Sequence, residues 1–558
     1  GYGVQKKSLV TGAISKVSSE ELTKNQVRIE QALQGKTAGV QIMQESGSPG
    51  GAMNIRIRGT GTNRNSNPLF VVDGMRTGGI EYLNPNDIAS IEILKDAASA
   101  AIYGAEKEKK VVLITTKSGN KDKTTISYNT NYGVQEVKNM NRVLNAKEYA
   151  TYYREGLRGE IENQYLGFEI PEELMNRALD NAYPFNPDTL GSGTNWLNEI
   201  FTPALMQEHN ISIAGGNEKT SVFFSGSYLT QDGVVGGSKS TFDRYTARLN
   251  LDHELKSWLS FGGKISFTHY ERSTIDENNE FGGVISNAMN IDPMTPVYYE
   301  DTSMFPQSYK PLIYDNFENI DNSSLRAPGD NGYYGMSELV QNEVRNPVAQ
   351  IDNDHNLWYT DKFLGGFNAT LKPIEGLTIK STFDVDLSYG NNNWWIPEYF
   401  YHSINYSYLS SVHKSTERWF TWQSENVATY SKKFDLHNIS VMAGNTARNH
   451  DYYYFYGKGE QMLEESWDFA VFDAVLSDSA KDATAGNRGQ DHRLLSYFGR
   501  AQYNYGEKNM IATTLRSDAS SKLSSKNRTK YYPSVSLGWV TSNEAFWNVS
   551  PINFMKLR

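Results

Sequence analysis

The side chains that could do chemistry are scattered in patterns that fit no enzyme. The nine histidines form no HExxH motif and the chain contains no cysteine, which excludes thiol catalysis and cysteine–zinc sites. The serine-rich stretches lack a nucleophile elbow. Two acidic runs, Asp276 to Glu280 and Asp352 to Asp354, could attract calcium, but neither has the twelve-residue loop spacing with its glycine and terminal glutamate. We therefore expect no enzyme, no cofactor and no resident metal.

One aromatic group could bind a ligand. Trp394 and Trp395 are adjacent, and Tyr399, Phe400 and Tyr401 follow in what we interpret as a long loop. Aromatic faces stack on sugar rings, so Trp394, Trp395 and Tyr399 are candidate contacts for an oligosaccharide. An aromatic girdle at a membrane interface would explain the same residues without a ligand. Both interpretations stay open.

Length and composition limit the class of protein. At 558 residues the chain exceeds one ordinary core, so we expect several domains or one very large closed sheet. No stretch approaches the roughly 18 apolar residues of a membrane helix, whereas the alternating strands of a membrane barrel escape a hydropathy search. The net charge of −10 argues against a general nucleic-acid binder. The chain opens at Gly1 without a signal-like segment, and we expect any targeting segment to lie outside this sequence.

Residues 1–120 are predicted to form a small mixed α/β domain. Ser18 or Ser19 can cap a helix, Glu20 or Glu21 can complete the cap, and Gly35 can end the helix. The predicted elements are a helix to Gln34, strands at Gly39 to Met43, Asn54 to Arg58, Leu69 to Val72 and Ile91 to Leu94, a helix at Asp96 to Tyr103 and a strand at Val111 to Thr116. The pair Asp73-Gly74 is a typical turn after the third strand.

Residues 121–558 carry a repeated strand pattern. From Thr124 to Val137, apolar and aromatic residues alternate with small polar ones, as in a strand with one apolar and one wet face. At least ten further copies follow, among them Tyr245 to Asp252, Leu259 to Thr268, Phe363 to Leu371, Leu377 to Tyr389, Leu495 to Tyr505 and Asn509 to Arg516. A soluble α+β domain joined to a β-sandwich would explain the strands alone.

The connections between the predicted strands alternate between short and long. The long ones are Lys138 to Gln207, Glu271 to Tyr359, Gly390 to Glu417 and Thr446 to His492. Short turns on one side and long loops on the other are typical of outer-membrane barrels. We therefore predict a large antiparallel transmembrane β-barrel for this part of the chain.

A set of short motifs, in a fixed order, resembles one known family. The matching runs are Gly1 to Gly3, Gln5 to Lys7, Thr11 to Ala13, Ala32 to Gly35, Ala38 to Val40, Ile55 to Gly59, Pro68 to Gly74, Leu83 to Asp87, Ile91 to Asp96, Ala101 to Gly104, Gly215 to Asn217, Tyr245 to Asn250, Pro533 to Trp539 and Pro551 to Arg558. The chain resembles the SusC/RagA type of TonB-dependent transporter of the Bacteroidetes. It departs from that family at the charged run Glu106 to Lys110, where small residues are usual.

The resemblance implies a fold, a function and partners. It implies that the N-terminal α/β domain lies inside the lumen of the barrel as a plug. A barrel wide enough to hold such a domain belongs to the class of about 22 strands, so we expect the C-terminal part of the barrel to be missing here. It implies active import of a large nutrient, an oligosaccharide or a peptide, through the outer membrane of a Gram-negative bacterium. The inner-membrane protein TonB would act through a segment before Gly1. A SusD-like surface lipoprotein would cover the loops Glu271 to Tyr359 and Gly390 to Glu417, and two transporter–lipoprotein pairs could form a dimer. The alternative is a structural or assembly subunit of an outer-membrane complex that keeps this fold without transporting.

The resemblance also suggests a latch between plug and barrel. The candidate residues are Arg56, Arg58, Asp73 and Gly74. Arg56 and Arg58 would pair with carboxylates of the wall such as Asp384 or Asp386, which makes a seal that can be broken. The other interpretation is that both arginines are ordinary sheet residues facing water.

Overall fold

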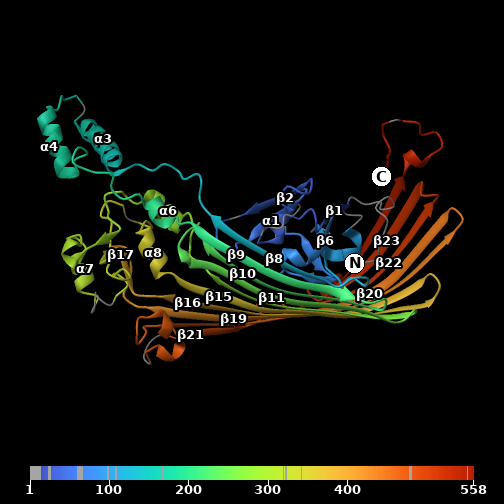
Figure 1. The fold of residues 1–558 in the computed structure, drawn as a ribbon. Coiled ribbons are helices and arrows are strands. Elements are labelled where there is room, and N and C mark those ends of the chain that lie inside the picture. Colours follow the sequence, from blue (N-terminus) through green and yellow to red (C-terminus); the bar gives the residue numbers. More distant parts are fainter. Residues whose placement is uncertain are drawn as a thin grey trace.

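The computed structural model describes most of the chain. The described residues are 14–22, 27–44, 46–59, 67–96, 100–106, 110–165, 167–317, 320, 323–340, 342–476, 481–549 and 551–558. A small N-terminal domain lies against the concave face of one large curved sheet, and helical loops gather at one end of that sheet (Figure 1). Within the described residues, no helix is both long and apolar enough to cross a membrane.

The N-terminal domain is built on a five-stranded sheet in the order β1-β6-β7-β4-β5. Its elements are β1 (Ile14–Ser18), α1 (Ile29–Leu33), β2 (Val40–Gln44), β3 (Met53–Ile57), β4 (Leu69–Val72), β5 (Met75–Thr77), η2 (Pro85–Asp87), β6 (Ile88–Leu94), η3 (Ala101–Glu106) and β7 (Val111–Thr116). Strands β2 and β3 form a separate two-stranded sheet. Strands β4 and β7 pair in parallel, and a core that includes Val72, Ile91 and Ile114 fills the space between sheet and helix.

The predicted helix from Ser18 or Ser19 to Gln34 is wrong. Ile14–Ser18 instead pairs with β6 as an edge strand, and the described helix in this stretch is the five-residue α1. The Ser18 backbone still donates to the Glu21 carboxylate at 2.7 Å, but this bond closes a turn after the strand. Long-range strand pairing overrides the local capping signal here. In the predicted helix at Asp96 to Tyr103, Ala100 is helical and donates to the Asp96 carbonyl at 3.1 Å. The residues that follow belong to the 3₁₀ segment η3, which breaks at Gly104 with φ 71°.

The large sheet contains thirteen strands, all antiparallel, in the order β24-β23-β22-β20-β19-β16-β15-β12-β11-β10-β9-β8, with β21 added to β20. Its strands are β8 (Thr125–Gln135), β9 (Ala204–Gly216), β10 (Thr220–Gly233), β11 (Gly237–Lys256), β12 (Leu259–Ser273), β15 (His355–Ile374), β16 (Leu377–Ile396), β19 (Ser411–Phe434), β20 (His437–Glu460), β21 (Lys481–Gly486), β22 (His492–Tyr505), β23 (Asn509–Ser520) and β24 (Thr529–Trp539). Neighbours in sequence are neighbours in the sheet, as the repeated pattern predicts.

Strand β11 shows how alternation divides the two faces of the large sheet. Tyr245 and Leu249 are 48% and 42% exposed on the convex face, whereas Arg244 and Arg248 are 0% and 5% exposed on the face that covers the N-terminal domain. The prediction that Tyr245 and Leu249 share one face opposite Arg248 is confirmed. An apolar outer face and a polar inner face are what a membrane barrel requires.

The long connections are shorter than predicted because the strands run further. Strand β16 continues to Ile396 and β19 begins at Ser411, so much of the predicted loop Gly390 to Glu417 is sheet. Residues 390–396 and 411–417 pair in register across the two strands. Beyond the apolar band both faces of a strand can be polar, so alternation disappears from the sequence while hydrogen bonding continues.

Several helices and short strands fold over the loop end of the large sheet. They are α3 (Ala146–Gln164), α4 (Glu172–Ala182), α5 (Trp196–Ile200), α6 (Val284–Asn290), α7 (Lys310–Tyr314), α8 (Pro347–Asn353), β13 (Tyr298–Tyr299), β14 (Tyr333–Tyr334), β17 (Tyr399–His402), β18 (Asn405–Ser407), and the 3₁₀ turns η4 (Thr302–Met304), η6 (Trp467–Phe469) and η7 (Phe472–Ala474). Two more 3₁₀ turns, η8 (Ser525–Asn527) and η9 (Thr541–Asn543), flank β24. Clusters of buried apolar residues hold these loops in fixed positions.

Replacing Ile114 with alanine should loosen the N-terminal domain without unfolding the large sheet. Ile114 is 1% exposed in the domain core, and deleting such a side chain costs about 2–5 kcal/mol. Limited proteolysis of the detergent-solubilised full-length protein should show faster cutting within residues 14–116. The adjacent exposed residue gives the control, Thr115→Ala. Equal protease resistance of the two variants would contradict this account of the core.

Candidate functional site

The contact between the N-terminal domain and the large sheet is the candidate functional site, and buried cations of the sheet dominate it. Arg244 and Arg248 lie four residues apart on β11 and so project from the same face. Arg516 of β23 is also fully buried. A buried guanidinium must find acceptors for its donors, and those acceptors come largely from the N-terminal domain.

The turn Asp73-Gly74 is held on two sides by the large sheet. The Asp73 carboxylate lies 2.8 Å from the Lys264 ammonium of β12 and 3.8 Å from the Arg248 guanidinium. The Gly74 carbonyl accepts a hydrogen bond of 3.2 Å from the Gln423 amide of β19. Because Asp73 and Gly74 both have positive φ, 53° and 105°, the turn projects tightly from the end of β4.

The two carboxylates near Arg248 have opposite electrostatic behaviour. Burial alone would raise the pKa of Asp73, but the Lys264 ammonium and the hydroxyl of Thr116 hold the pKa of that carboxyl below its usual value. Thr116 donates to it at 2.6 Å. Asp87 lies 3.5 Å from the Arg248 guanidinium, yet burial outweighs this attraction and raises the pKa of Asp87. Asp73 is therefore the charged anchor of the pair.

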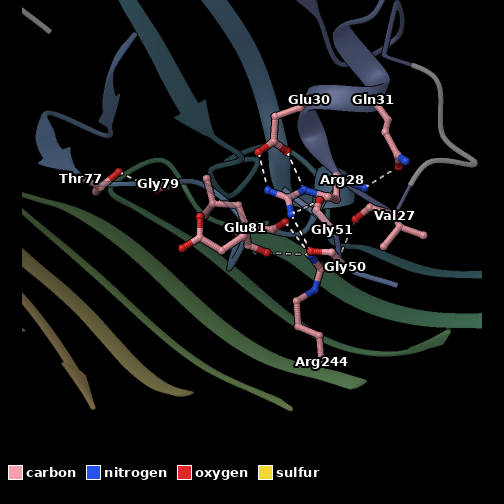
Figure 2. A network of polar contacts seen from close by, with 11 residues as sticks. Val27, Arg28, Glu30, Gln31, Gly50, Gly51, Thr77, Gly79, Glu81 and Arg244 are labelled. Carbon is pink, nitrogen blue, oxygen red and sulfur yellow. Dashed lines mark hydrogen bonds and ion pairs between the residues drawn. The ribbon is translucent and has the colours of Figure 1, made fainter. Parts of the chain in front are cut away.

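A second contact centres on Arg244 and is visible in Figure 2. The Arg244 guanidinium donates to the backbone carbonyls of Glu81 and Leu83 at 3.1 Å and of Val27 at 3.4 Å. Beside it, the Arg28 guanidinium is paired with the Glu30 carboxylate at 2.7 Å and donates to the carbonyl of Gly50 at 2.8 Å. Arg244 thus ties two separate segments of the N-terminal domain to one strand of the large sheet.

Gly50 shows how closely this contact is packed. Its φ is +57°, and a Cβ atom there would lie 2.5 Å from the ring of Phe242 on β11. The Gly50 amide also donates to the Gln231 side chain of β10 at 3.4 Å. At the top of the same turn, Ser48 donates to the Glu277 carboxylate of the loop after β12 at 2.5 Å. A glycine is required here because the domain and the sheet approach so closely.

A third contact lies on the far side of the concave face. Arg516 is paired with Asp518 on the same strand at 2.7 Å and donates to the carbonyl of Ile102 at 2.6 Å. A side chain at Gly104 would overlap the Asp518 carboxylate. The three contacts therefore hold the N-terminal domain from β11, β19 and β23.

Among the described residues, Arg56 and Arg58 form no ion pair with Asp384 or Asp386, and the arginine latch stays a prediction. Arg56 is exposed on β3, and Arg58 is exposed with its guanidinium 3.4 Å from the Lys95 carbonyl. Asp386 is paired instead with Lys362 of the neighbouring strand at 2.5 Å. The difference arises because β3 pairs only with β2 and presents its charged face to solvent. Of the four latch candidates, Asp73 and Gly74 are the ones that contact the large sheet.

The predicted aromatic candidates are divided between two faces of the sheet. Trp394 and Trp395 lie in β16 rather than in a loop. Trp394 is 39% exposed and stacks on His413 with ring centroids 4.8 Å apart. Trp395 is 5% exposed on the opposite face, covered by the loop that carries Met462. Tyr399 begins β17 and packs against Tyr401. A role for the three in substrate contact stays a prediction.

The remaining sequence predictions have separate outcomes. The charged run Glu106 to Lys110 lies largely outside the described residues, since 107–109 and the Glu106 side chain are not described. Among the described residues, no group of three or more histidine and carboxylate side chains is arranged to hold a metal ion. The small sheet ends at Thr116 and the large one begins at Thr125, and the division at residue 120 stays a prediction.

The chain is similar to known proteins over nearly its whole length. Residues 6–107 match the family model for the TonB-dependent receptor plug domain. TonB-dependent receptor P26 of Formosa agariphila is 32% identical, with 100% of this chain and 52% of that protein covered. TonB-dependent receptor SusC of Bacteroides thetaiotaomicron is 27% identical, again with 100% and 52% covered. The chain spans about half the length of the curated relatives it matches.

A solved structure shows the same fold. The structure described as the RagAB peptide importer in the open-open state aligns with a TM-score of 0.76 and 24% identity, covering 98% of this chain and 59% of that one. The chain belongs to the SusC-type TonB-dependent receptors. The N-terminal domain is the plug of such a receptor, and the large sheet is part of the wall of its transmembrane barrel. This family is not a class of enzymes.

Sequence reasoning missed the barrel residues that hold the plug. The sequence patterns include Arg248 and Lys264 only as members of the polar faces of two strands, and they do not single out Arg244, Gln423 or Arg516. One signal was present: long cationic side chains on the inner face of a strand otherwise rich in small polar residues. Their partners are backbone carbonyls or carboxylates more than a hundred positions away, which no spacing rule connects.

Replacing Asp73 with asparagine should loosen the plug. The variant keeps the shape of the side chain but leaves Lys264 and Arg248 without their anion, and breaking a buried ion pair costs about 3 kcal/mol or more. Ion leakage through the full-length receptor in planar bilayers should increase. The control is the double variant Arg56→Ala with Arg58→Ala, which changes only exposed side chains. Unchanged leakage in Asp73→Asn would contradict the role of Asp73 as the anchor. Leakage in the arginine variant equal to that of Asp73→Asn would support the arginine latch.

The seal should also respond to acid in a defined direction. A carboxyl whose pKa is lowered on folding contributes stability above its unfolded value, about 3.9, and loses that contribution as pH falls through the lower folded pKa. Asp73 should therefore hold the plug equally from neutral pH down to about pH 4 and release it only below. Ion leakage through the wild-type receptor in bilayers should therefore increase as the pH falls below about 4. Leakage through Asp73→Asn should show no such acid-dependent increase. An identical acid profile in both proteins would refute the assignment.

Proposed function

We propose that the receptor to which this chain belongs imports a large nutrient, an oligosaccharide or a peptide, across the outer membrane using energy from TonB. The observation that supports this most directly is the chemistry of the plug–wall contact. Asp73, Arg244, Arg248 and Arg516 hold the plug through charges and carbonyls, groups that water can solvate again when the plug moves. Such a contact seals at rest and can be reversed.

We infer that TonB acts from the N-terminal side of the plug. The proposed point of contact is a segment preceding Gly1. A pulling force that TonB exerts there would reach the first described elements, β1 and α1, before the rest of the plug. Within the described residues, Arg28 links α1 to the turn at Gly50 and Gly51, and Arg244 links the same region to the wall. A pull on this end would therefore act on the Arg244 contact first.

A SusD-like surface lipoprotein is the proposed partner at the opposite end. The loops between β12 and β15 and between β16 and β19 form a platform with its own buried clusters, in which Phe400 packs against Tyr309 and Phe317. A folded platform at the mouth can support a lid, whereas loose loops would have to be ordered on binding. We propose outer-membrane localisation with the plug in residues 1–120 and the barrel in residues 121–558.

A lock between plug and wall should stop import reversibly. The chain has no cysteine, so one new pair can be placed at Thr116 and Asn250, whose side chains are 3.0 Å apart across the interface. The oxidised full-length receptor should lose nutrient uptake in cells, and a reductant should restore it. A purely structural subunit would be indifferent to the lock, so full uptake in the oxidised state would refute transport through plug movement.

A deletion strain separates transport from the structural alternative. Loss of growth on one glycan or peptide source, with growth on monomers unchanged, is the result expected of an importer. Loss of an outer-membrane complex with growth on every polymer source unchanged would favour the structural or assembly subunit.

A further inference from the structure

The inner face of the barrel wall carries a group of aromatic side chains above the plug. Lys362 of β15 contacts the plug, with its ammonium 4.7 Å from the ring centre of Tyr82, and this fixes which residues of β15 face inward. Alternation and register then place six rings on the same face of four adjacent strands. They are Trp358, Trp394, Trp419, Tyr452, Tyr454 and Tyr456, here called the aromatic track.

The track runs from the loop end of the strands down to the plug. Trp394 is at its outer end, two residues before the end of β16. Trp419 and Tyr452 are at its inner end, in the same register row as Ser388 and Lys362. Successive rows on one face are about 6.6–6.8 Å apart, so rings recur at short intervals along the whole path. The path therefore leads from the mouth to the plug contact.

The rings are held in fixed orientations by their neighbours. Trp394 stacks on His413 with an angle of 27° between the planes, and His413 is 2.8 Å from the Tyr456 hydroxyl. Trp419 and Tyr452 have ring centroids 5.6 Å apart, and Tyr452 donates to the Glu417 carboxylate at 2.6 Å. Rings fixed in this way can bind a flat apolar face at little entropic cost.

Neutral polar groups lie between the rings. In one register row, Trp358, Asn392, Ser415 and Tyr456 follow one another across the four strands. The side-chain oxygens of Asn356 and Asn392 are buried and accept no hydrogen bond from the described residues. Amides and hydroxyls beside aromatic faces suit a ligand whose rings have apolar faces and a rim of hydroxyls.

Two of the cations beside the track are paired within the wall, Lys362 with Asp386 at 2.5 Å and Lys458 with Glu460 at 2.5 Å. A third cation, Arg488, lies over the ring of Tyr454, with its guanidinium carbon 3.9 Å from the ring centroid. The backbone of these central strands is committed to its neighbours on both sides, so an extended peptide cannot add as a further strand. The backbone of an extended peptide therefore finds no complement on these strands.

We propose that the aromatic track binds the ring faces of a neutral oligosaccharide and leads it from the barrel mouth to the plug. The proposal rests on the proposed import function and names its substrate class. A sugar chain seated on Trp419 and Tyr452 lies next to Lys362, which is itself in contact with the plug through Tyr82.

Paired variants on one strand provide the test. Inward and outward residues alternate on β20, so Tyr454→Ala with Tyr456→Ala removes two rings of the track. Tyr453→Ala with Phe455→Ala removes two exposed rings from the outer face of the same strand. Calorimetric titration of the full-length receptor with maltohexaose and cellohexaose should show binding of at least one of them. The inward variant should weaken that binding about tenfold or more, which corresponds to 1.4 kcal/mol, and the outward variant should leave it unchanged.

Three comparisons decide the outcome. A hexapeptide and the acidic hexamer of galacturonic acid should bind more weakly than the neutral sugar. Tighter binding of either one with the same dependence on the inward rings would overturn the neutral-glycan assignment, and equal effects of the inward and outward variants would overturn the track. Trp394→Ala at the outer end gives an independent variant if the β20 variant fails to fold. Because the cysteine lock tests import whatever the substrate, a failed track with a working lock leaves the proposed function standing.

Discussion

Buried guanidinium groups require hydrogen-bond acceptors, and the position of the plug inside the wall depends on this requirement. Arg244 and Arg516 are fully enclosed, and neither could remain inside the barrel if the plug did not present carbonyls to them. The same need makes the plug specific for this wall, because the acceptors must be at the right places on three separate strands. It also explains the tight turns at Gly50 and Gly104, where a side chain would push the carbonyl-bearing segments away from their donors.

Because side chains alternate between the two faces of each strand, the same wall can contact the lipid, the plug and the lumen above the plug. On β11 the outward residues between Tyr245 and Leu251 are apolar, and the inward residues Arg244, Arg248 and Asn250 bind the plug. On β19 the inward residues change along the strand: Gln423 contacts the plug, and Trp419 lies above it. The outward residues change over the same distance from apolar to polar. The two-residue repeat of a β-strand therefore accounts for the lipid contacts, the plug contacts and the aromatic track within one fold.

Much of this architecture can be predicted from the sequence. The features that could not be predicted depend on contacts between residues far apart in the chain, which local patterns do not encode. The alternation on β11, the plug sheet and the turn at Asp73-Gly74 follow from local patterns. The helix expected from Ser18 is absent because Ile14–Ser18 pairs with a strand 72 to 80 residues away, which a local capping signal cannot predict. A local pattern cannot identify the partner of Asp386 either, which is Lys362 on the adjacent strand. The sequence predicts a loop at Trp394 and Trp395 because two adjacent aromatic residues show no alternation. In the structure they lie on opposite faces of β16, and both faces accept an aromatic ring, since the loop that carries Met462 covers Trp395.

The pair Lys362–Asp386 joins the two parts of the mechanism. Lys362 contacts Asp386, the Ser388 hydroxyl at 3.2 Å and the plug ring of Tyr82, and its register row contains Trp419 and Tyr452. Excluding water from this row strengthens both contacts of the ammonium, because the ion pair with Asp386 and the contact with the ring of Tyr82 are both electrostatic. Lys362 therefore belongs at once to the wall that carries the aromatic track and to the surface that holds the plug.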